Sequence, residues 1–548
     1  MRALAVFAGA LLMASVCGAQ SRDVAAPLKA TSRIRGRVVA ADSGQPLRRA
    51  MVRLAAPELR EGRTAITDSD GRYEFKDLPS GRYSLTAAKS RFVRLEYGQT
   101  RPMEMGRPLE LRANQTLERV NFRLPRGSVI AGRIIDEFGE PVASARVQLL
   151  QIRYLDGRPR LVPAGGSGTT WDTGEFRIWS VMPGAYLVSA TLHDTPDSLD
   201  SDERSGYAPS YYPGTPNIAE AQTLAVGVGQ TIADLFLSLV PTRLARVSGM
   251  AIDSDGQVVR GGVVMALQRN PASLFMPTSG EIRSDGSFAL SGLAPGEYIL
   301  RAAAPGSVGS ETLSATVNVD GKDVAGIVLA PVKTATVTGR ITFEPPGQAP
   351  PPAGIWLSVE PKNPEPREFL PGAGSSVVAD DFTFELSAPP GEMLIRATPT
   401  TRSAGWVLKA VGHHHTDVTD AGMNFFSGQH VEGVEIVMTK RTQDVSGVVT
   451  NARGELVKDC TVIVFAQDRE RRLGRTRYTA VGRPDQDGRY RLTTLPPGEY
   501  FAVALEYVDE NRRSGDPGYL ETLSTRAARF AVREGETKTL DLKLEATP

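Results

Sequence analysis

The five histidines of this 548-residue chain are the first side chains to examine for chemistry, because imidazole is a common general base and metal ligand. Three of them are consecutive at residues 413–415, and His430 follows. Consecutive residues on a strand point to opposite faces, so three neighbouring imidazoles cannot all bind one ion. His413, His415 and His430 are therefore candidates only for opportunistic binding of zinc or nickel in an exposed loop. We expect no dedicated metal site and no cofactor.

Sequence patterns of catalytic sites are absent from the chain. It contains no His-Glu-x-x-His, no Gly-x-Ser-x-Gly and no phosphate-binding P-loop. Residues 42–44 and 172–174 match the Asp-Ser/Thr-Gly triplet of aspartic proteases, whose two carboxylates share a proton, but both lie on turns of different repeats. Residues 68–71 and 485–488 resemble the start of a calcium loop but lack its bidentate glutamate. We therefore predict that the protein is not an enzyme.

Aromatic side chains offer a second kind of chemistry, because an exposed ring can stack on a sugar. Trp179 falls at an outward position of a predicted strand, aligned with Lys76 of an earlier repeat, so we expect its ring to be exposed. An aromatic loop bounded by prolines follows at residues 207–213. Two interpretations stay open: the rings pack the loop onto its own domain, which we favour, or they bind a polysaccharide. The candidate ligand-binding residues are Trp171, Trp179, Tyr207, Tyr211 and Tyr212.

Composition limits the elements that can position these residues. A chain of 548 residues is too long for one hydrophobic core, so several domains are expected. Lys and Arg number 63 and Asp and Glu 62, and this net charge of +1 favours neither nucleic acid nor an anionic membrane. Two cysteines cannot staple several domains, and we expect Cys460 to be a small core residue. No segment after the N-terminus is apolar for long enough to be a transmembrane helix.

One pattern of strands and turns recurs five times and accounts for the many glycines and prolines. Each copy begins with an apolar strand that has a central glycine, and continues with an Asp-Gly turn, an alternating strand and a Pro-Gly corner. Strands at this spacing predict an antiparallel β-sandwich of roughly 100 residues. We therefore predict an all-β chain of five tandem immunoglobulin-like or transthyretin-like sandwiches. Their ranges are 32–127, 128–243, 244–333, 334–440 and 441–548.

The fourth copy departs from the pattern. It has Asp381-Phe382 where the others have a turn glycine, and Met393 replaces the corner tyrosine, so we expect it to be the most divergent. That tyrosine resembles the tyrosine corner of immunoglobulin-like sandwiches, whose phenol hydrogen-bonds to nearby backbone. Helices are expected only within loops, at residues 217–221 and 517–528.

The repeat resembles the carboxypeptidase regulatory-like domain. The resemblance rests on Gly-x-Pro turns at residues 44–46 and 139–141, on Thr-Asp-x-Asp-Gly-x-Tyr at 67–73, and on Leu-Pro-x-Gly-x-Tyr at 78–83. It implies a transthyretin-like sandwich, grouped with carbohydrate-binding-like folds and generally a non-catalytic appendage of exported peptidases, receptors and surface proteins. A related sandwich cross-links a first-strand lysine to an asparagine. None of the five first strands here contains lysine, so we expect no cross-link.

The N-terminus predicts export. Residues 1–19 have the charged, apolar and small-residue regions of a signal peptide, with cleavage before Gln20, and lipidation of Cys17 is the second alternative. We expect a secreted, periplasmic or cell-surface protein, monomeric and without a nucleic-acid partner. The leading hypothesis is a non-enzymatic binding or spacer protein of the cell envelope that binds carbohydrate. The alternative is a protein-interaction scaffold or an accessory module for an envelope receptor or peptidase.

Overall fold

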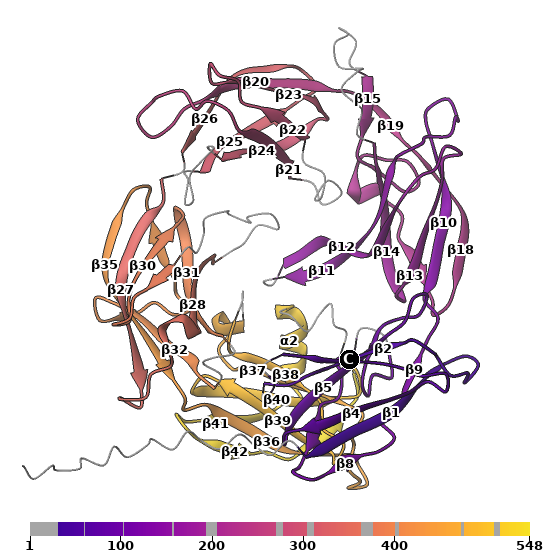
Figure 1. The fold of residues 1–548 in the computed structure, drawn as a ribbon, viewed down its shortest axis with the longest axis vertical. Helices are drawn as coiled ribbons and strands as arrows, with labels where there is room; N and C mark the ends of the chain where they lie inside the picture. Colours follow the sequence, from indigo (N-terminus) through magenta and orange to yellow (C-terminus); the bar gives the residue numbers. More distant parts are fainter. Residues whose placement is uncertain are drawn as a thin grey trace, which may run out of the picture.

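A computed structural model describes residues 31–547, except for residues 58, 60, 102–103, 156–157, 193–204, 270–277, 304–311, 332, 363–375, 401–404, 473–475 and 509–515. The predicted signal peptide and Cys17 lie outside the described residues. Groups of strands follow one another around a closed ring, and the first and last groups lie side by side (Figure 1). The prediction of an all-β fold is confirmed.

The strands enclose large hydrophobic clusters, each formed by one continuous stretch of chain. We call these stretches units 1 to 5. Their clusters lie within residues 34–124, 130–239, 245–329, 335–438 and 445–542. Alternating apolar residues of two facing layers of strands fill each cluster, as in a β-sandwich.

Units 1 and 2 each have two sheets, a smaller one on the outside of the ring and a larger one toward its centre (Figure 1). We call them the outer and the inner sheet. In unit 1 the outer strands are β1 (Ser32–Ala40), β4 (Arg72–Leu78), β8 (Thr116–Leu117) and β9 (Phe122–Leu124), and the inner ones are β2 (Met51–Ala55), β3 (Arg63–Ile66), β5 (Gly81–Ala88), β6 (Leu95–Glu96) and β7 (Leu109–Leu111). In unit 2 the outer strands are β10 (Ser128–Ile135), β13 (Glu175–Val181) and β18 (Thr231–Ser238), and the inner ones are β11 (Arg146–Leu155), β12 (Arg158–Thr169), β14 (Gly184–Thr191), β16 (Ser210–Tyr211) and β17 (Leu224–Val226). A separate pair, β15 (Ser205–Ala208) and β19 (Val240–Arg243), leads toward unit 3.

Units 3 and 4 differ in how their layers connect. Unit 3 is one continuous sheet of β20 (Ala245–Ala251), β21 (Val263–Gln268), β22 (Thr278–Glu281), β23 (Ser287–Leu293), β24 (Gly296–Ala303), β25 (Thr312–Val319) and β26 (Val324–Pro331). Unit 4 has a six-stranded sheet of β27 (Ala335–Glu344), β29 (Ser376–Val378), β30 (Thr383–Ala388), β32 (Val407–His413), β33 (Thr416–Asp417) and β35 (His430–Thr439). Its second sheet contains β28 (Ile355–Pro361), β31 (Gly391–Pro399) and β34 (Met423–Phe425), and a short 3₁₀ helix, η4 (Pro352–Gly354), precedes β28.

Unit 5 adds a helix to the same plan. Its strands are β36 (Gln443–Thr450), β37 (Thr461–Ala466), β38 (Thr479–Gly482), β39 (Arg489–Leu495), β40 (Gly498–Leu505), β41 (Ala528–Val532), β42 (Thr537–Thr539) and β43 (Leu542–Glu545), with a 3₁₀ turn, η6 (Glu470–Arg472). Helix α2 (Pro517–Ser524) is shorter than predicted and begins where Asp516 caps the amides of Gly518 and Tyr519. The helix expected at residues 217–221 is the 3₁₀ turn η2 (Ile218–Glu220). Cys460 is buried in the core, as expected, and burial raises the pKa of its thiol to about 12.

The first strand of every unit has a parallel neighbour as well as an antiparallel one. In unit 2, for example, β10 pairs antiparallel with β13 and parallel with β18, the last strand of the unit. The central glycine of the first strand lies at this parallel contact. A Cβ at Gly249 would lie 1.8 Å from the carbonyl oxygen of Ile327, and the distance is 1.8–2.1 Å at all five glycines. The repeated glycine is therefore required by the close approach of two backbones.

The tyrosine corner predicted from the sequence is present in four units. Each phenol donates a hydrogen bond to the carbonyl oxygen four residues earlier, at 2.6–2.9 Å. Burial raises the pKa of Tyr298 and Tyr500 above the usual range of tyrosine. The four residues are Tyr83, Tyr186, Tyr298 and Tyr500.

The fourth unit diverges as expected, and the structure shows how. Phe382 occupies the position of the turn glycine and keeps its left-handed backbone, with φ +64° against +72° at Gly71. The ring of Phe382 packs edge-on against Phe343, with 4.7 Å between centroids. The β27–β30 pair also lacks the register shift found in the corresponding pair of each other unit.

Candidate functional site

The two candidate tryptophans lie toward opposite ends of β13 in unit 2. Trp179 is 49 % exposed, as predicted, and guanidinium groups lie over its ring: Arg177 at 4.2 Å and Arg91 of unit 1 at 5.7 Å from the centroid. Trp171 is 57 % exposed in the turn before the strand, where its backbone N–H donates to the carbonyl oxygen of Glu175. Four residues separate Glu175 from Trp179, which is about 13 Å along a strand. The two rings therefore do not form one stacking platform.

The three candidate tyrosines of unit 2 contact their own unit. Tyr211 is fully buried on β16, in a small cluster with Leu150 and Leu187, so its ring cannot meet a ligand at the surface. Tyr212 packs against the main hydrophobic cluster of the unit. Tyr207 donates its hydroxyl to Glu137 at 2.8 Å. These contacts agree with the first of the two interpretations, in which the aromatic loop packs onto its own domain.

The histidine candidates do not converge. His413 ends β32 opposite Val434 of β35, whereas His430 begins β35, four residues away or about 13 Å along the strand. His415 lies in the turn after β32, with φ +63°. Burial, followed by the neighbouring imidazole of His414, lowers the pKa of His413. Within the part of the chain that the structure describes, no three His, Cys, Asp or Glu side chains are grouped to hold a metal ion.

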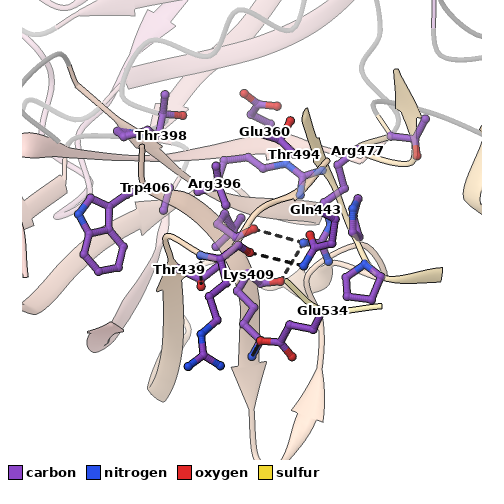
Figure 2. A pocket seen from close by; sticks show the side chains of 18 residues that line it. Glu360, Arg396, Thr398, Trp406, Lys409, Thr439, Gln443, Arg477, Thr494 and Glu534 are labelled. Atoms are coloured by element: carbon purple, nitrogen blue, oxygen red, sulfur yellow. Dashed lines mark hydrogen bonds and ion pairs between the residues drawn. The ribbon is translucent and has the colours of Figure 1, made fainter. Parts of the chain in front are cut away.

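A cleft of about 530 Å³ between units 4 and 5 was not anticipated from the sequence (Figure 2). Strands β28, β31, β32 and β35 of unit 4 form one wall, and β36, β39 and the loops before β38 and after β41 of unit 5 form the other. Its labelled lining residues are Glu360, Arg396, Thr398, Trp406, Lys409, Thr439, Gln443, Arg477, Thr494 and Glu534.

Ion pairs connect the two walls of this cleft. Lys409 Nζ lies 2.7 Å from Glu344 Oε2 of its own unit and 2.7 Å from Glu534 Oε1 of unit 5. Hydrogen bonds to Glu344 and Glu534 raise the pKa of Lys409. The ammonium is therefore neutralised by carboxylates from both units.

A second set of contacts joins the same two units, and here unit 5 supplies the cation and unit 4 the carboxylate. Arg477 of unit 5 donates to Asp420 of unit 4 at 2.9 Å and to the carbonyl oxygen of Lys409 at 2.8 Å. Tyr478 donates to the same Asp420 carboxylate at 3.1 Å. Lys409 and Arg477 therefore join units 4 and 5, each through a carboxylate of the other unit.

Sequence reasoning missed these residues because their partners are distant in the chain. Lys409 is separated from Glu344 by 65 residues and from Glu534 by 125. Lys409 sits in the predicted strand that precedes the histidines, and nothing in its local sequence indicates a partner in another unit.

The fold and these contacts define a multi-unit β-sandwich protein, and comparison with known proteins adds a family-model match within its first unit. Residues 33–125 match the family model of the carboxypeptidase regulatory-like domain, which confirms the predicted resemblance over this segment. A segment of the chain is 32 % identical over 201 residues to a protein named TonB-dependent transporter Oar from Myxococcus xanthus. The match covers 35 % of this chain and 17 % of the transporter, so the chain spans a small part of that relative's length.

Several solved structures are similar at low sequence identity. The Bacillus anthracis TIE protein is 11 % identical, with 76 % of this chain and 72 % of that chain covered and a TM-score of 0.14. A streptococcal ancillary pilin is 11 % identical, with 57 % and 98 % covered and a TM-score of 0.20. These scores are too low to compare the arrangement of units. None of the helices among the described residues is long and apolar enough to span a membrane.

Proposed function

We propose that the chain is a non-catalytic binding or spacer protein of the cell envelope, built from five β-sandwich domains. The domains would extend over residues 32–127, 128–243, 244–333, 334–440 and 441–548. The similarity of one segment to a protein named as a TonB-dependent transporter supports an envelope location, and the signal peptide predicted at residues 1–19 agrees with it. The carboxypeptidase regulatory-like match at residues 33–125 supports a non-catalytic role.

Within this proposal we favour a protein-interaction scaffold over a carbohydrate-binding protein. The observation that carries this choice is the use of charged residues at the joints between units. Lys409 and Arg477 each bind a carboxylate of the neighbouring unit, and these contacts fix the angle between two sandwiches. A fixed angle suits a protein that holds other components at set positions.

The location is tested by fractionating cells that produce the full chain and sequencing the mature N-terminus by mass spectrometry. We expect the protein in the periplasmic, outer-membrane or extracellular fraction, with a new N-terminus at Gln20. A diacylated Cys17 would replace the cleavage site but keep the envelope location. A cytosolic protein that begins at Met1 would contradict the proposal.

Carbohydrate binding is the second candidate, favoured by the exposed ring of Trp179 with Arg177 beside it. If the chain binds polysaccharide there, Trp179→Ala should lower retention in affinity electrophoresis about tenfold, because stacking on an aromatic ring contributes on the order of 1 kcal/mol or more. Trp356→Ala is the matched control, an exposed tryptophan of unit 4 that is not among the candidate residues. Equal retention of both variants and the parent chain, or a glycan array without signal, would remove this candidate and leave the scaffold.

A further inference from the structure

Units 1 and 5 are distant in sequence but lie side by side in space (Figure 1). A buried arginine of unit 5 contacts unit 1. The guanidinium of Arg483 in unit 5 donates to two carbonyl oxygens of unit 1, those of Gly98 at 3.1 Å and Met105 at 2.8 Å. It lies 3.2 Å from the carboxylate of Glu104 of unit 1 and also pairs with Asp459 of its own unit. The Arg483 side chain has no exposed surface, and that of Glu104 is 3 % exposed.

Glu104, the carboxylate of unit 1 that pairs with Arg483, is itself held by hydrogen bonds within unit 1. Glu104 accepts hydrogen bonds from the backbone amide of Thr100 at 3.0 Å and from its hydroxyl at 3.1 Å. These bonds hold the carboxylate beside the arginine. A buried guanidinium needs such a set of acceptors, because an unpaired charge away from water is strongly unfavourable.

A second contact between units 1 and 5 is a pair of hydrogen bonds between a side-chain amide and the backbone of a strand. The side-chain amide of Gln486 accepts from the backbone N–H of Glu110 at 3.0 Å and donates to the carbonyl oxygen of the same residue at 2.8 Å. Glu110 belongs to β7, an edge strand of the inner sheet of unit 1. Gln486 therefore covers part of an edge strand of unit 1 by bonding to both backbone groups of Glu110.

Further interactions surround these two contacts. They are the ion pairs Arg107–Asp459 at 3.6 Å and Arg112–Asp487 at 3.7 Å, the hydrogen bond from Arg82 to the carbonyl of Arg491 at 3.1 Å, and the cation–π contact of Arg101 with Tyr507 at 4.9 Å. All four join unit 1 to unit 5, and in three of them unit 1 contributes the cation to a side chain of unit 5. Two of these ion pairs place a cation of unit 1 on a carboxylate of unit 5, and the buried pair Arg483–Glu104 places a cation of unit 5 on a carboxylate of unit 1.

We propose that these residues form a clasp that closes the chain on itself, so that the protein is a monomeric ring in solution. The clasp is defined by Arg483, Gln486, Asp459 and Asp487 of unit 5 with Gly98, Glu104, Met105, Arg107, Glu110 and Arg112 of unit 1. The two surfaces differ, and they belong to one chain whose other units bring them together, so the effective concentration of one for the other is high. The inference concerns the shape of the chain and stands independently of the proposed function.

The clasp is tested by small-angle X-ray scattering and analytical ultracentrifugation of the full chain. We expect the parent chain to sediment as a monomer, with scattering that matches the ring. Arg483→Met removes the buried charge while keeping the length of the side chain. It should open the ring and raise the radius of gyration by roughly 1.2-fold or more, since neighbouring domains without a large interface move relative to one another. Arg489→Met, an exposed arginine close by in the same unit, is the matched control and should leave the radius unchanged.

A second variant and a local measurement separate opening from unfolding. Gln486→Glu replaces the amide donor by a carboxylate facing the carbonyl of Glu110, at a partly exposed turn. It should also raise the radius, whereas Gln257→Glu, the same change on an exposed turn of unit 3, should not. In hydrogen exchange, residues 104–112 should lose protection in both clasp variants while β37 and β40 keep theirs. An unchanged radius in both variants, an extended parent chain, or parent oligomers that dissociate on dilution would each overturn the proposal.

Discussion

Replacing Gly339 by alanine is expected to destabilise unit 4 by about 3 kcal/mol, enough to unfold a marginal sandwich. The added Cβ would lie 1.9 Å from the carbonyl oxygen of Val434 and 2.8 Å from the ring of Phe384, so two strands and a core ring would have to move apart. Because the chain has several units, the effect should be local. Hydrogen exchange followed by mass spectrometry should show lost protection within residues 335–438 and none elsewhere.

Gly412→Ala is the control for this prediction. Gly412 lies on β32 of the same unit, and a Cβ there would come no closer than 3.9 Å to its neighbours. We expect its protection pattern to equal that of the parent chain. If Gly339→Ala were as protected as Gly412→Ala, the close backbone approach would not explain the repeated glycine.

Leu520→Ala is expected to detach helix α2 from unit 5. Leu520 is fully buried and packs in a cluster with Ile463, Phe465 and Leu523, on the face of β37 and β40 opposite the main core. Removing its side chain should cost about 3 kcal/mol, which exceeds what an eight-residue helix can supply by itself. The amides of residues 517–524 should then exchange freely.

The exposed neighbour on the same helix provides the comparison. Thr522→Ala removes a surface hydroxyl that donates to the carbonyl of Tyr519, and alanine favours the helix, so protection should stay or increase. Thermal unfolding should show a separate early transition for Leu520→Ala alone. Equal protection of the helix in both variants would mean that other contacts hold it in place.

The repeated unit could be predicted from the sequence because its signals are local. The strand glycine, the Asp-Gly turn and the corner tyrosine lie within short windows, and each enforces a backbone geometry wherever it occurs. The parallel pairing of first and last strands was not visible, since β10 and β18 are about a hundred residues apart and either strand alone fits an antiparallel sheet. The Asp-Gly turn did not predict which strands pair. In unit 1 the turn at residues 68–71 is closed by a local hydrogen bond, but β3 before it and β4 after it belong to different sheets.

The candidate sites were harder to predict than the fold. Exposure of Trp179 followed from strand alternation, but the burial of Tyr211 depends on pairing of β16 with β14, which composition does not indicate. The joints between units depend on partners far apart in sequence. Arg483 and Gly98 are separated by 385 residues, so an arginine after β38 could not be distinguished from any surface arginine.

The clasp also determines how the molecule responds to force. Residue 31 belongs to unit 1, and Thr547 is held to Tyr507 of unit 5 by hydrogen bonds of 2.8 and 3.2 Å. Tension applied through these two points acts first on the contacts around Arg483, before it reaches the hydrogen-bonded ladders inside any sandwich. When those contacts break, the ring lengthens while its sandwiches stay folded, and it can close again when the tension is released. The chain would then behave as an extensible tether with a defined breaking point.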